Sequence, residues 1–128
     1  MQLLYPEKHM TELQQRLEQH PEAWWLICFC AAWCRTCAGF EEVLEQFASS
    51  HPEVVCVWVD IEEHEELLLD DDLVDLPTFA LQKAGHTYFY APLPPMIEHV
   101  QRLYQQAEKQ LLPPLDDTTY PIFTQLLP

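Results

Sequence analysis

Two short, continuously apolar runs constrain what this chain can fold into more than any other feature. They are "AWWLICFC" at residues 23–30 and "VVCVWV" at residues 54–59, and runs of this length and composition are typical of strands covered on both faces. Between them, four apolar residues recur at i, i+3, i+4 and i+7: Phe40, Val43, Leu44 and Phe47. We therefore predict a helix from about Cys34 to Ala48 and, with its flanking strands, a βαβ unit of an α/β fold.

Other segments extend this unit into one domain over residues 1–111. Helical spacing predicts a helix capped by Thr11 or an earlier residue and ending near Pro21, a short helix within 62–69, and a final helix over about 96–111. The runs at 78–82 and 86–90 flank a short turn and predict an antiparallel hairpin. Residues 112–128 carry four prolines and scattered apolar side chains, so we predict a C-terminal extension that docks on its own domain or on a partner.

The composition excludes several classes of function. The 128 residues carry 21 acidic and 6 basic side chains, a formal net charge of −15, which repels phosphate backbones and anionic membrane surfaces. We therefore expect neither nucleic acid nor a membrane as a partner. Only two glycines are present, and a phosphate-cradling loop needs clustered glycines, so a nucleotide-binding enzyme is excluded as well.

The use of cysteine indicates a reducing compartment. Five cysteines are an odd number, and four of them lie within ten residues, which is not the pattern of a secreted disulfide scaffold. Residues 1–23 hold a polar, charged stretch where a signal peptide would have an apolar core. We therefore expect a cytoplasmic protein.

The sequence "AAWCRTCAGF" at residues 31–40 places two cysteines, two residues apart, where the first strand gives way to the helix. A helix N-terminus and the positive charge of Arg35 both stabilise a thiolate, the nucleophilic form of cysteine, at Cys34. Cys37 can reach back from the first helical turn and close a disulfide with Cys34. We therefore predict a redox disulfide in which Cys34 attacks and Cys37 resolves, with no dissociable cofactor.

A metal site is the alternative use of such a pair. Structural zinc takes four ligands, and one CxxC supplies half of them. Cys28 and Cys30 lie in the buried strand, face the same side of it, and cannot both fold easily onto the start of the helix. None of the six histidines pairs convincingly with the motif, so we predict no metal.

Three segments in order resemble the thioredoxin family. "WLICFCAAWCRTC" is similar to its strand and active-site motif, "VVCVWVDIEEHEEL" to its next strand with a terminal Asp, and "VDLPTFALQKAG" to its cis-proline loop and hairpin, so that the resemblance covers roughly residues 8–110. It implies a thioredoxin fold, with a central mixed β-sheet flanked by helices, and a cis peptide before Pro77. It also implies that Leu76 and Pro77 lie against the motif and bind the substrate chain. Trp33 would shield the disulfide and contact the substrate; the alternative is a plain core tryptophan.

The chain departs from the family pattern at positions that modulate this chemistry. Arg35 and Thr36 replace the usual Gly-Pro between the cysteines, a pair that tunes the reduction potential. Cys28 and Cys56 stand where the family carries a buried acid and a nearby lysine. We expect these two thiols to face each other across neighbouring strands, with pKa values raised by burial; a disulfide between them is conceivable but disfavoured.

The predicted function is that of a thiol–disulfide oxidoreductase, which reduces protein disulfides and draws electrons from a separate thiol or flavoprotein reductase. The alternative is a thioredoxin-like chaperone or assembly factor that holds a dedicated protein partner through its tail and an acidic face. That face comprises Glu62, Glu63, Glu65, Glu66, Asp70, Asp71, Asp72 and Asp75. Because it precedes the Pro77 loop, we expect it to border the substrate groove.

Overall fold

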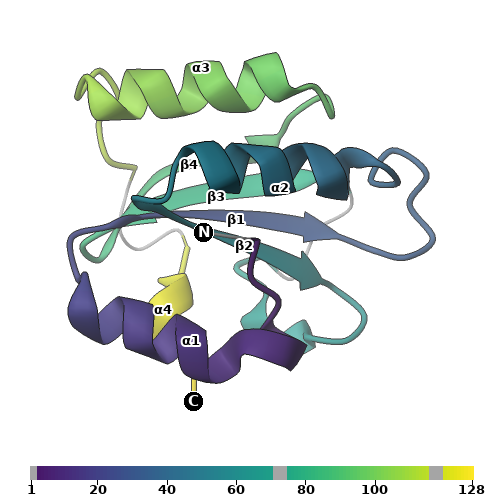
Figure 1. The fold of residues 1–128 in the computed structure, drawn as a ribbon, viewed down its shortest axis with the longest axis horizontal. Helices are drawn as coiled ribbons and strands as arrows, with labels where there is room; N and C mark the ends of the chain where they lie inside the picture. The colour runs from purple at the N-terminus through teal and green to yellow at the C-terminus, as the bar shows by residue number, and fades with distance from the viewer. Residues whose placement is uncertain (1–2, 71–74, 116–119) are drawn as a thin grey trace.

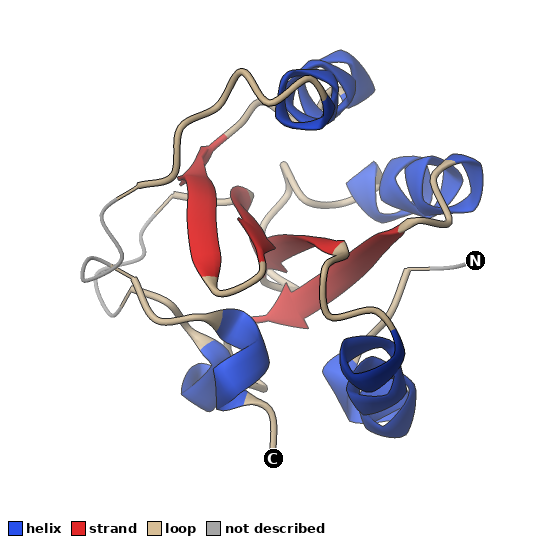
Figure 2. Ribbon diagram, turned by 90° about the vertical axis from the view of Figure 1, so that its left-hand side faces the viewer, coloured by secondary structure: helices blue, strands red, loops and turns tan. Residues whose placement is uncertain are grey.

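The computed structural model describes residues 3–70, 75–115 and 120–128, and it arranges them in three layers (Figure 1, Figure 2). A four-stranded sheet lies in the middle, with α2 and α3 on one face and α1 and α4 on the other. The elements are α1 (Pro6–Gln19), β1 (Trp24–Cys30), α2 (Phe40–Ser50), β2 (Val54–Asp60), the 3₁₀ turn η1 (Glu65–Leu67), β3 (Thr78–Lys83), β4 (His86–Pro92), α3 (Ile97–Glu108) and α4 (Phe123–Leu126). Within the described residues, no helix has the length and apolar character needed to span a membrane.

The sheet is mixed, with strand order β2-β1-β3-β4. β1 runs parallel to β2 and antiparallel to β3, and β3 forms an antiparallel hairpin with β4. The hairpin turn holds Ala84 and Gly85 at φ values of 51° and 80°, a left-handed conformation that glycine adopts without steric cost. At the other edge, Leu4 forms a parallel bridge with Val57. The predicted βαβ unit, the hairpin and the mixed sheet of a thioredoxin fold are therefore confirmed.

Side-chain alternation along β1 divides the core in two. Ile27 and Phe29 belong to the cluster under α1 and α4, whereas Cys28 and Cys30 belong to the cluster under α2 and α3. All four side chains are completely buried. The cysteines of β1 therefore lie on the face of the sheet that α2 covers.

Helix α2 begins at Phe40, later than the predicted start near Cys34. Gly39 precedes it with a φ of 82°, a left-handed conformation that interrupts any helical run from the motif. The motif itself forms turns, in which the amide of Cys34 donates to the carbonyl of Ala31, and that of Phe40 donates to the carbonyl of Cys37. Cys34 therefore lies outside the helix, and the predicted stabilisation of its thiolate by a helix N-terminus is not supported.

The first helix agrees with the prediction, which allowed a cap before Thr11 and an end near Pro21, whereas the acidic segment differs from it. α1 begins at Pro6, where a proline fits because the first turn leaves its amide hydrogens unpaired. The acidic segment forms only η1 instead of a helix over 62–69. A longer helix would place the like charges of Glu62 and Glu66 one turn apart. Asp71 and Asp72, which were assigned to the acidic face, lie outside the described residues.

Residues 120–128 dock on their own domain, on the face of the sheet that α1 also covers (Figure 2). Phe123 is completely buried, and the ring of Tyr120 lies 4.4 Å from that of Tyr90 on β4. Gln82 on β3 holds the backbone of the tail: its Nε2 donates to the carbonyl of Pro121 (3.1 Å), and its Oε1 accepts from the amide of Phe123 (2.8 Å). α4 also contacts η1. Of the two fates predicted for the tail, docking on its own domain is confirmed.

Candidate redox site

The predicted redox motif lies in the loop that connects the carboxyl end of β1 to α2. Cys34 and Cys37 are buried, with 9% and 3% of their surface exposed, whereas Arg35 and Thr36 between them are exposed. The loop therefore turns both cysteines inward and the two intervening residues toward solvent. Cys34 is the more accessible cysteine of the pair, which suits it to meet a second protein.

The disulfide of this structure joins Cys30 to Cys37. Their Cα atoms are 6.1 Å apart, within the usual range for a disulfide. Cys34 is a free thiol, so the predicted pairing of Cys34 with Cys37 is not the one found here. The physical reason is the late start of α2, which leaves Cys37 in a turn beside the end of β1 instead of in a helical turn with Cys34.

Cys28 and Cys56 lie on the same face of the sheet as the motif, but the prediction that they face each other directly is wrong. In the register of β1 and β2, Cys28 pairs with Trp58, and Cys56 pairs with Leu26. Both are free, buried thiols. Burial raises the pKa of Cys28, and the negative charge that Cys34 or Cys56 would carry as a thiolate raises it further. Burial also raises the pKa of Cys56 to about 12, so both thiols stay neutral near pH 7, as predicted.

The peptide bond between Leu76 and Pro77 is cis, as the family resemblance implied. β3 begins at the next residue, Thr78, which pairs with Phe29 near the end of β1. This register brings the Pro77 loop to the end of the sheet where β1 ends and the motif begins. Leu76 also packs against the core cluster that contains both motif cysteines, so the predicted substrate-binding loop borders the site.

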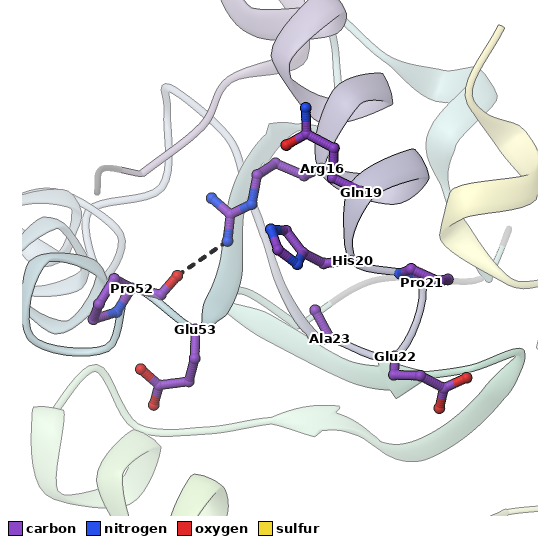
Figure 3. Close-up of a pocket in the computed structure, with 8 residues that line it drawn as sticks. All are labelled: Arg16, Gln19, His20, Pro21, Glu22, Ala23, Pro52 and Glu53. Carbon is purple, nitrogen blue, oxygen red and sulfur yellow. Dashed lines mark hydrogen bonds between the residues drawn. The ribbon is translucent and has the colours of Figure 1, made fainter.

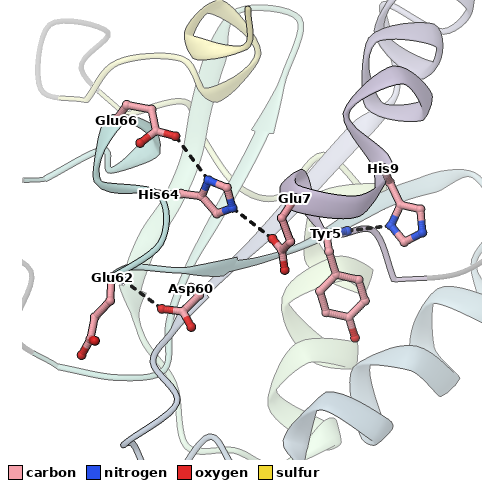
Figure 4. A network of polar contacts seen from close by, with 7 residues as sticks. All are labelled: Tyr5, Glu7, His9, Asp60, Glu62, His64 and Glu66. Atoms are coloured by element: carbon pink, nitrogen blue, oxygen red, sulfur yellow. Dashed lines mark hydrogen bonds and ion pairs between the residues drawn. The ribbon is translucent and has the colours of Figure 1, made fainter.

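Trp33 is exposed over 62% of its surface, which excludes its interpretation as a core residue. Its indole nitrogen donates a hydrogen bond to the carboxylate of Glu62. The amide of Glu62 in turn donates to Asp60 Oδ1 at 2.9 Å (Figure 4). These contacts tie the start of the acidic segment to the motif loop. A protein that contacts Trp33 therefore also meets the negative charge of Glu62.

His64 links the acidic segment to the start of α1 (Figure 4). Its Nε2 lies 3.0 Å from Glu7 Oε1, and its Nδ1 lies 3.2 Å from Glu66 Oε1. A neutral imidazole carries one N–H, so only the protonated ring can donate to both carboxylates. Burial lowers the pKa of His64, but the hydrogen bonds and charges of Glu7 and Glu66 outweigh it and raise the pKa above its ordinary value.

A cavity of about 700 Å³ lies at the opposite end of the sheet from the motif (Figure 3). Its lining comes from the end of α1 and from the residues that precede β1 and β2, whereas the motif follows β1. Arg16 is buried there, and its Nη2 donates to the carbonyl of Pro52 at 3.1 Å. The cavity is therefore separate from the cysteine site.

Thiol–disulfide exchange is the chemistry that this arrangement supports. All five cysteines lie in one buried cluster, and four of them come from β1 and the loop after it: Cys28, Cys30, Cys34 and Cys37. Across the described parts of the chain, no three His, Cys, Asp or Glu side chains are grouped to hold a metal ion. The clustered cysteines supply the thiols and the disulfide that thiol–disulfide exchange requires.

Comparison with known proteins places the chain in a family. The family model described as Thioredoxin matches residues 5–108, and the chain belongs to the thioredoxin family. Thioredoxin-1 of Caenorhabditis elegans is 31% identical over 75 residues, which cover 59% of this chain and 65% of the worm protein. The thioredoxin of Alicyclobacillus acidocaldarius is 36% identical over 61 residues, which cover 47% of this chain and 58% of the bacterial protein. The chain thus spans less than two thirds of the length of these relatives.

Solved structures agree at the level of the fold. Thioredoxin NaTrxh from Nicotiana alata superposes with a TM-score of 0.67 at 17% identity, over 82% of this chain and 91% of that one. The thioredoxin of Fasciola hepatica gives a TM-score of 0.66 at 20% identity, over 83% and 98%. At this level of identity, the similarity establishes the thioredoxin fold and not a particular activity.

Cys30 is the residue of this site that the sequence analysis did not assign. The signal was present, because Cys30 is two residues from Cys28 and therefore faces the same side of β1. The family pattern places the Cys28 position beneath the motif, so Cys30 had to lie near the motif as well. The conclusion was missed because the helix was expected to start at Cys34, which would have turned Cys37 toward Cys34 alone.

Proposed function

We propose that this protein is a thiol–disulfide oxidoreductase that reduces protein disulfides with the dithiol of Cys34 and Cys37. The observation that carries the proposal is the position of this pair, at the carboxyl edge of the sheet beside Leu76 and Pro77. Membership of the thioredoxin family supports the same reaction.

The reaction begins with attack by Cys34. The Cys34 thiolate attacks one sulfur of a substrate disulfide, the substrate S–S bond breaks, and the other substrate sulfur leaves as a thiolate that takes up a proton. Cys37 then attacks the Cys34 sulfur of the mixed disulfide and releases the second substrate thiol. Two electrons have passed from the protein dithiol to the substrate, and Cys34 is disulfide-bonded to Cys37.

The surroundings of the pair assign further roles. Trp33 is exposed next to Cys34, and we assign it an apolar contact with the substrate chain. We assign a second contact to Leu76 and Pro77, which directly precede β3. Arg35 and Thr36 face solvent between the cysteines and modulate the stability of the thiolate form. Cys28 and Cys56 also modulate the reactivity of the pair, as neutral thiols buried beneath the motif.

The cycle needs an electron donor, because each substrate leaves the protein oxidised. We assign this role to a thiol or a flavoprotein reductase and place the cycle in the cytoplasm, in line with the odd number of cysteines. The chaperone alternative depended partly on a tail free to hold a partner. Phe123 of that tail is instead buried in the protein's own core.

Insulin reduction tests the proposal and the two cysteine roles together. With dithiothreitol, or with NADPH and a thioredoxin reductase, the wild-type protein should accelerate the precipitation of insulin chains. Cys34→Ser should abolish the acceleration, because the nucleophile is lost. Cys37→Ser should accumulate a mixed disulfide with an insulin chain, because resolution fails.

Two results would contradict this assignment. A Cys34→Ser variant as active as the wild type would exclude the proposed nucleophile. A mixed disulfide that accumulates in the Cys34→Ser variant and not in the Cys37→Ser variant would mean that the two roles are reversed. Non-reducing electrophoresis followed by intact mass measurement separates these outcomes.

A further inference from the structure

All five cysteines belong to one buried cluster, although only Cys34 and Cys37 exchange electrons in the proposed function. Cys28 and Cys30 lie on β1, and Cys34 and Cys37 lie in the loop that follows it. We propose that Cys30 is a third redox cysteine, which competes with Cys34 for Cys37 and gives the oxidised protein two disulfide isomers. This inference deepens the proposed function, on which it rests for the roles of Cys34 and Cys37.

The backbone brings Cys30 and Cys37 together. Cys30 is the last residue of β1, and it is bonded to Cys37 across a Cα–Cα distance of 6.1 Å. The turn in which Phe40 donates to the carbonyl of Cys37 keeps Cys37 outside α2, beside the strand. Cys37 is therefore bonded to Cys30 on the strand and lies three residues from Cys34, in the same loop and the same buried cluster.

Cys28 supports the second pairing from within the strand. Its Sγ lies 3.7 Å from that of Cys30, within the range of a weak hydrogen bond between sulfur atoms. Burial raises the pKa of Cys28, so its thiol keeps a proton that it can donate. Cys28 can therefore stabilise a thiolate at Cys30 without competing as a nucleophile.

The exchange between the two isomers needs no added oxidant. Starting from the disulfide between Cys34 and Cys37, the Cys30 thiolate attacks Cys37 Sγ and forms a new S–S bond. The bond to Cys34 breaks, and Cys34 leaves as a thiolate that takes up the proton Cys30 has lost. The number of disulfides and the oxidation state of the protein are unchanged.

The two isomers differ in what Cys34 can do next. In the isomer with Cys34 bonded to Cys37, the protein is inert until a donor reduces it. In the isomer with Cys30 bonded to Cys37, Cys34 is a free thiol at the more accessible position and can attack another disulfide. Cys37 is then unavailable, so the mixed disulfide lasts until a thiol of the substrate or of the donor attacks it.

A thiol count on Cys34→Ser tests the inference without any substrate. The variant keeps four of the five cysteines. After equilibration with oxidised dithiothreitol, acid quenching and alkylation with N-ethylmaleimide in denaturant, we expect two alkylated cysteines instead of four. Four alkylated cysteines in the folded, oxidised variant would overturn the inference. In the matched double variant Cys30→Ser/Cys34→Ser, all three remaining cysteines should be alkylated.

The sequence allows the bond to be located directly. Cleavage by trypsin after Arg35 and by chymotrypsin after Phe29, Trp33 and Phe40 separates Cys30, Cys34 and Cys37 onto different peptides. In the Cys34→Ser digest, peptides 30–33 and 36–40 should be joined by a disulfide. A different joined pair would overturn the inference even if the thiol count fell to two.

The wild-type protein supplies a second, independent measurement. After the same oxidation, a fraction of wild-type molecules should carry an alkylated Cys34, and this fraction should disappear in Cys30→Ser. An alkylated fraction that persists in Cys30→Ser would overturn the inference. Insulin reduction by the wild type reports on the proposed function alone. If the wild type reduces insulin but Cys34→Ser shows four alkylated cysteines, only the inference is rejected. If the wild type does not reduce insulin but Cys34→Ser forms the bond between Cys30 and Cys37, only the proposed function is rejected.

Discussion

At Cys28, a thiol replaces the buried acid that the thioredoxin family usually carries beneath its active site. The side chain is completely buried, and burial raises the pKa of its thiol. No charge is therefore available there near pH 7 to move protons to and from Cys37. The position is thus favourable for stability and unfavourable for proton transfer, because an ionised acid in the same place would have to be desolvated.

Exchanging Cys28 for an acid tests this trade against a neutral side chain of the same shape. At pH 7, Cys28→Asp should have a free energy of unfolding lower than that of Cys28→Asn by about 3 kcal/mol, because burial raises the pKa of a carboxyl by two units or more. The penalty should vanish below about pH 4, where the carboxyl is neutral in both states, and should grow as the pH rises and the unfolded chain ionises. Urea unfolding at several pH values measures it.

The same pair of variants reports on the reaction. If proton transfer at position 28 limits resolution by Cys37, Cys28→Asp should reduce insulin faster than Cys28→Asn near neutral pH. Equal rates would contradict a limiting proton transfer, whatever the stabilities.

At the scale of elements, the strands could be predicted from the sequence and the start of α2 could not. A strand that is buried on both faces has a continuous apolar sequence, and β1 and β2 therefore coincide with the two apolar runs. The helical spacing of apolar residues in α2 begins at Phe40. The motif before it contains no proline, and Gly39 is its only residue that indicates a turn. The partner of Cys37 depends on that boundary, so the motif cysteines were predictable and their pairing was not.

The C-terminal tail is an element that local sequence rules could not place, because Gln82 determines where it docks. No local sequence pattern predicts that a glutamine in a strand is buried. The side chain of Gln82 forms three hydrogen bonds: Nε2 donates to Thr87 Oγ1 (2.9 Å) and to the Pro121 carbonyl, and Oε1 accepts from the Phe123 amide. The tail and the hairpin are therefore coupled through one residue.

Removing that side chain should loosen the tail. Gln82→Ala leaves the carbonyl of Pro121 and the amide of Phe123 without their partner, which should cost about 1–3 kcal/mol in the free energy of unfolding. The amide of Phe123 should exchange with solvent faster, as hydrogen-exchange mass spectrometry of residues 120–128 can measure. Gln125→Ala, at an exposed position of α4, the helix that begins at Phe123, is the matched control and should leave the exchange of the Phe123 amide unchanged. Equal protection in both variants would mean that the burial of Phe123 alone holds the tail.

At the scale of the whole molecule, the formal net charge of −15 sets how the protein responds to pH. Acidic side chains repel one another in the folded state, and this repulsion weakens as protons bind. Protonation of all six histidines would reduce the net charge to −9. Between pH 8 and pH 6 the histidines are the side chains whose ordinary pKa values lie in range, so acidification should not harm this protein.

His64 should make the fold more stable as the pH falls from 8 to 6. Its pKa is raised in the folded protein by Glu7 and Glu66, so the folded state binds the proton more tightly than the unfolded chain. The resulting stabilisation is complete below the unfolded pKa of about 6.5 and is lost as the pH rises through the higher folded value. Because Glu7 is 43% exposed and Glu66 is 67% exposed, solvent screens the contacts, and the gain should be no more than about 1 kcal/mol.

Urea unfolding at pH 6 and pH 8 should therefore show a smaller difference in the free energy of unfolding between the two pH values for His64→Gln than for the wild type. His20→Gln, at an exposed position beyond α1, should keep the wild-type difference, and a loss there equal to that of His64→Gln would assign the effect to net charge instead of to these two contacts.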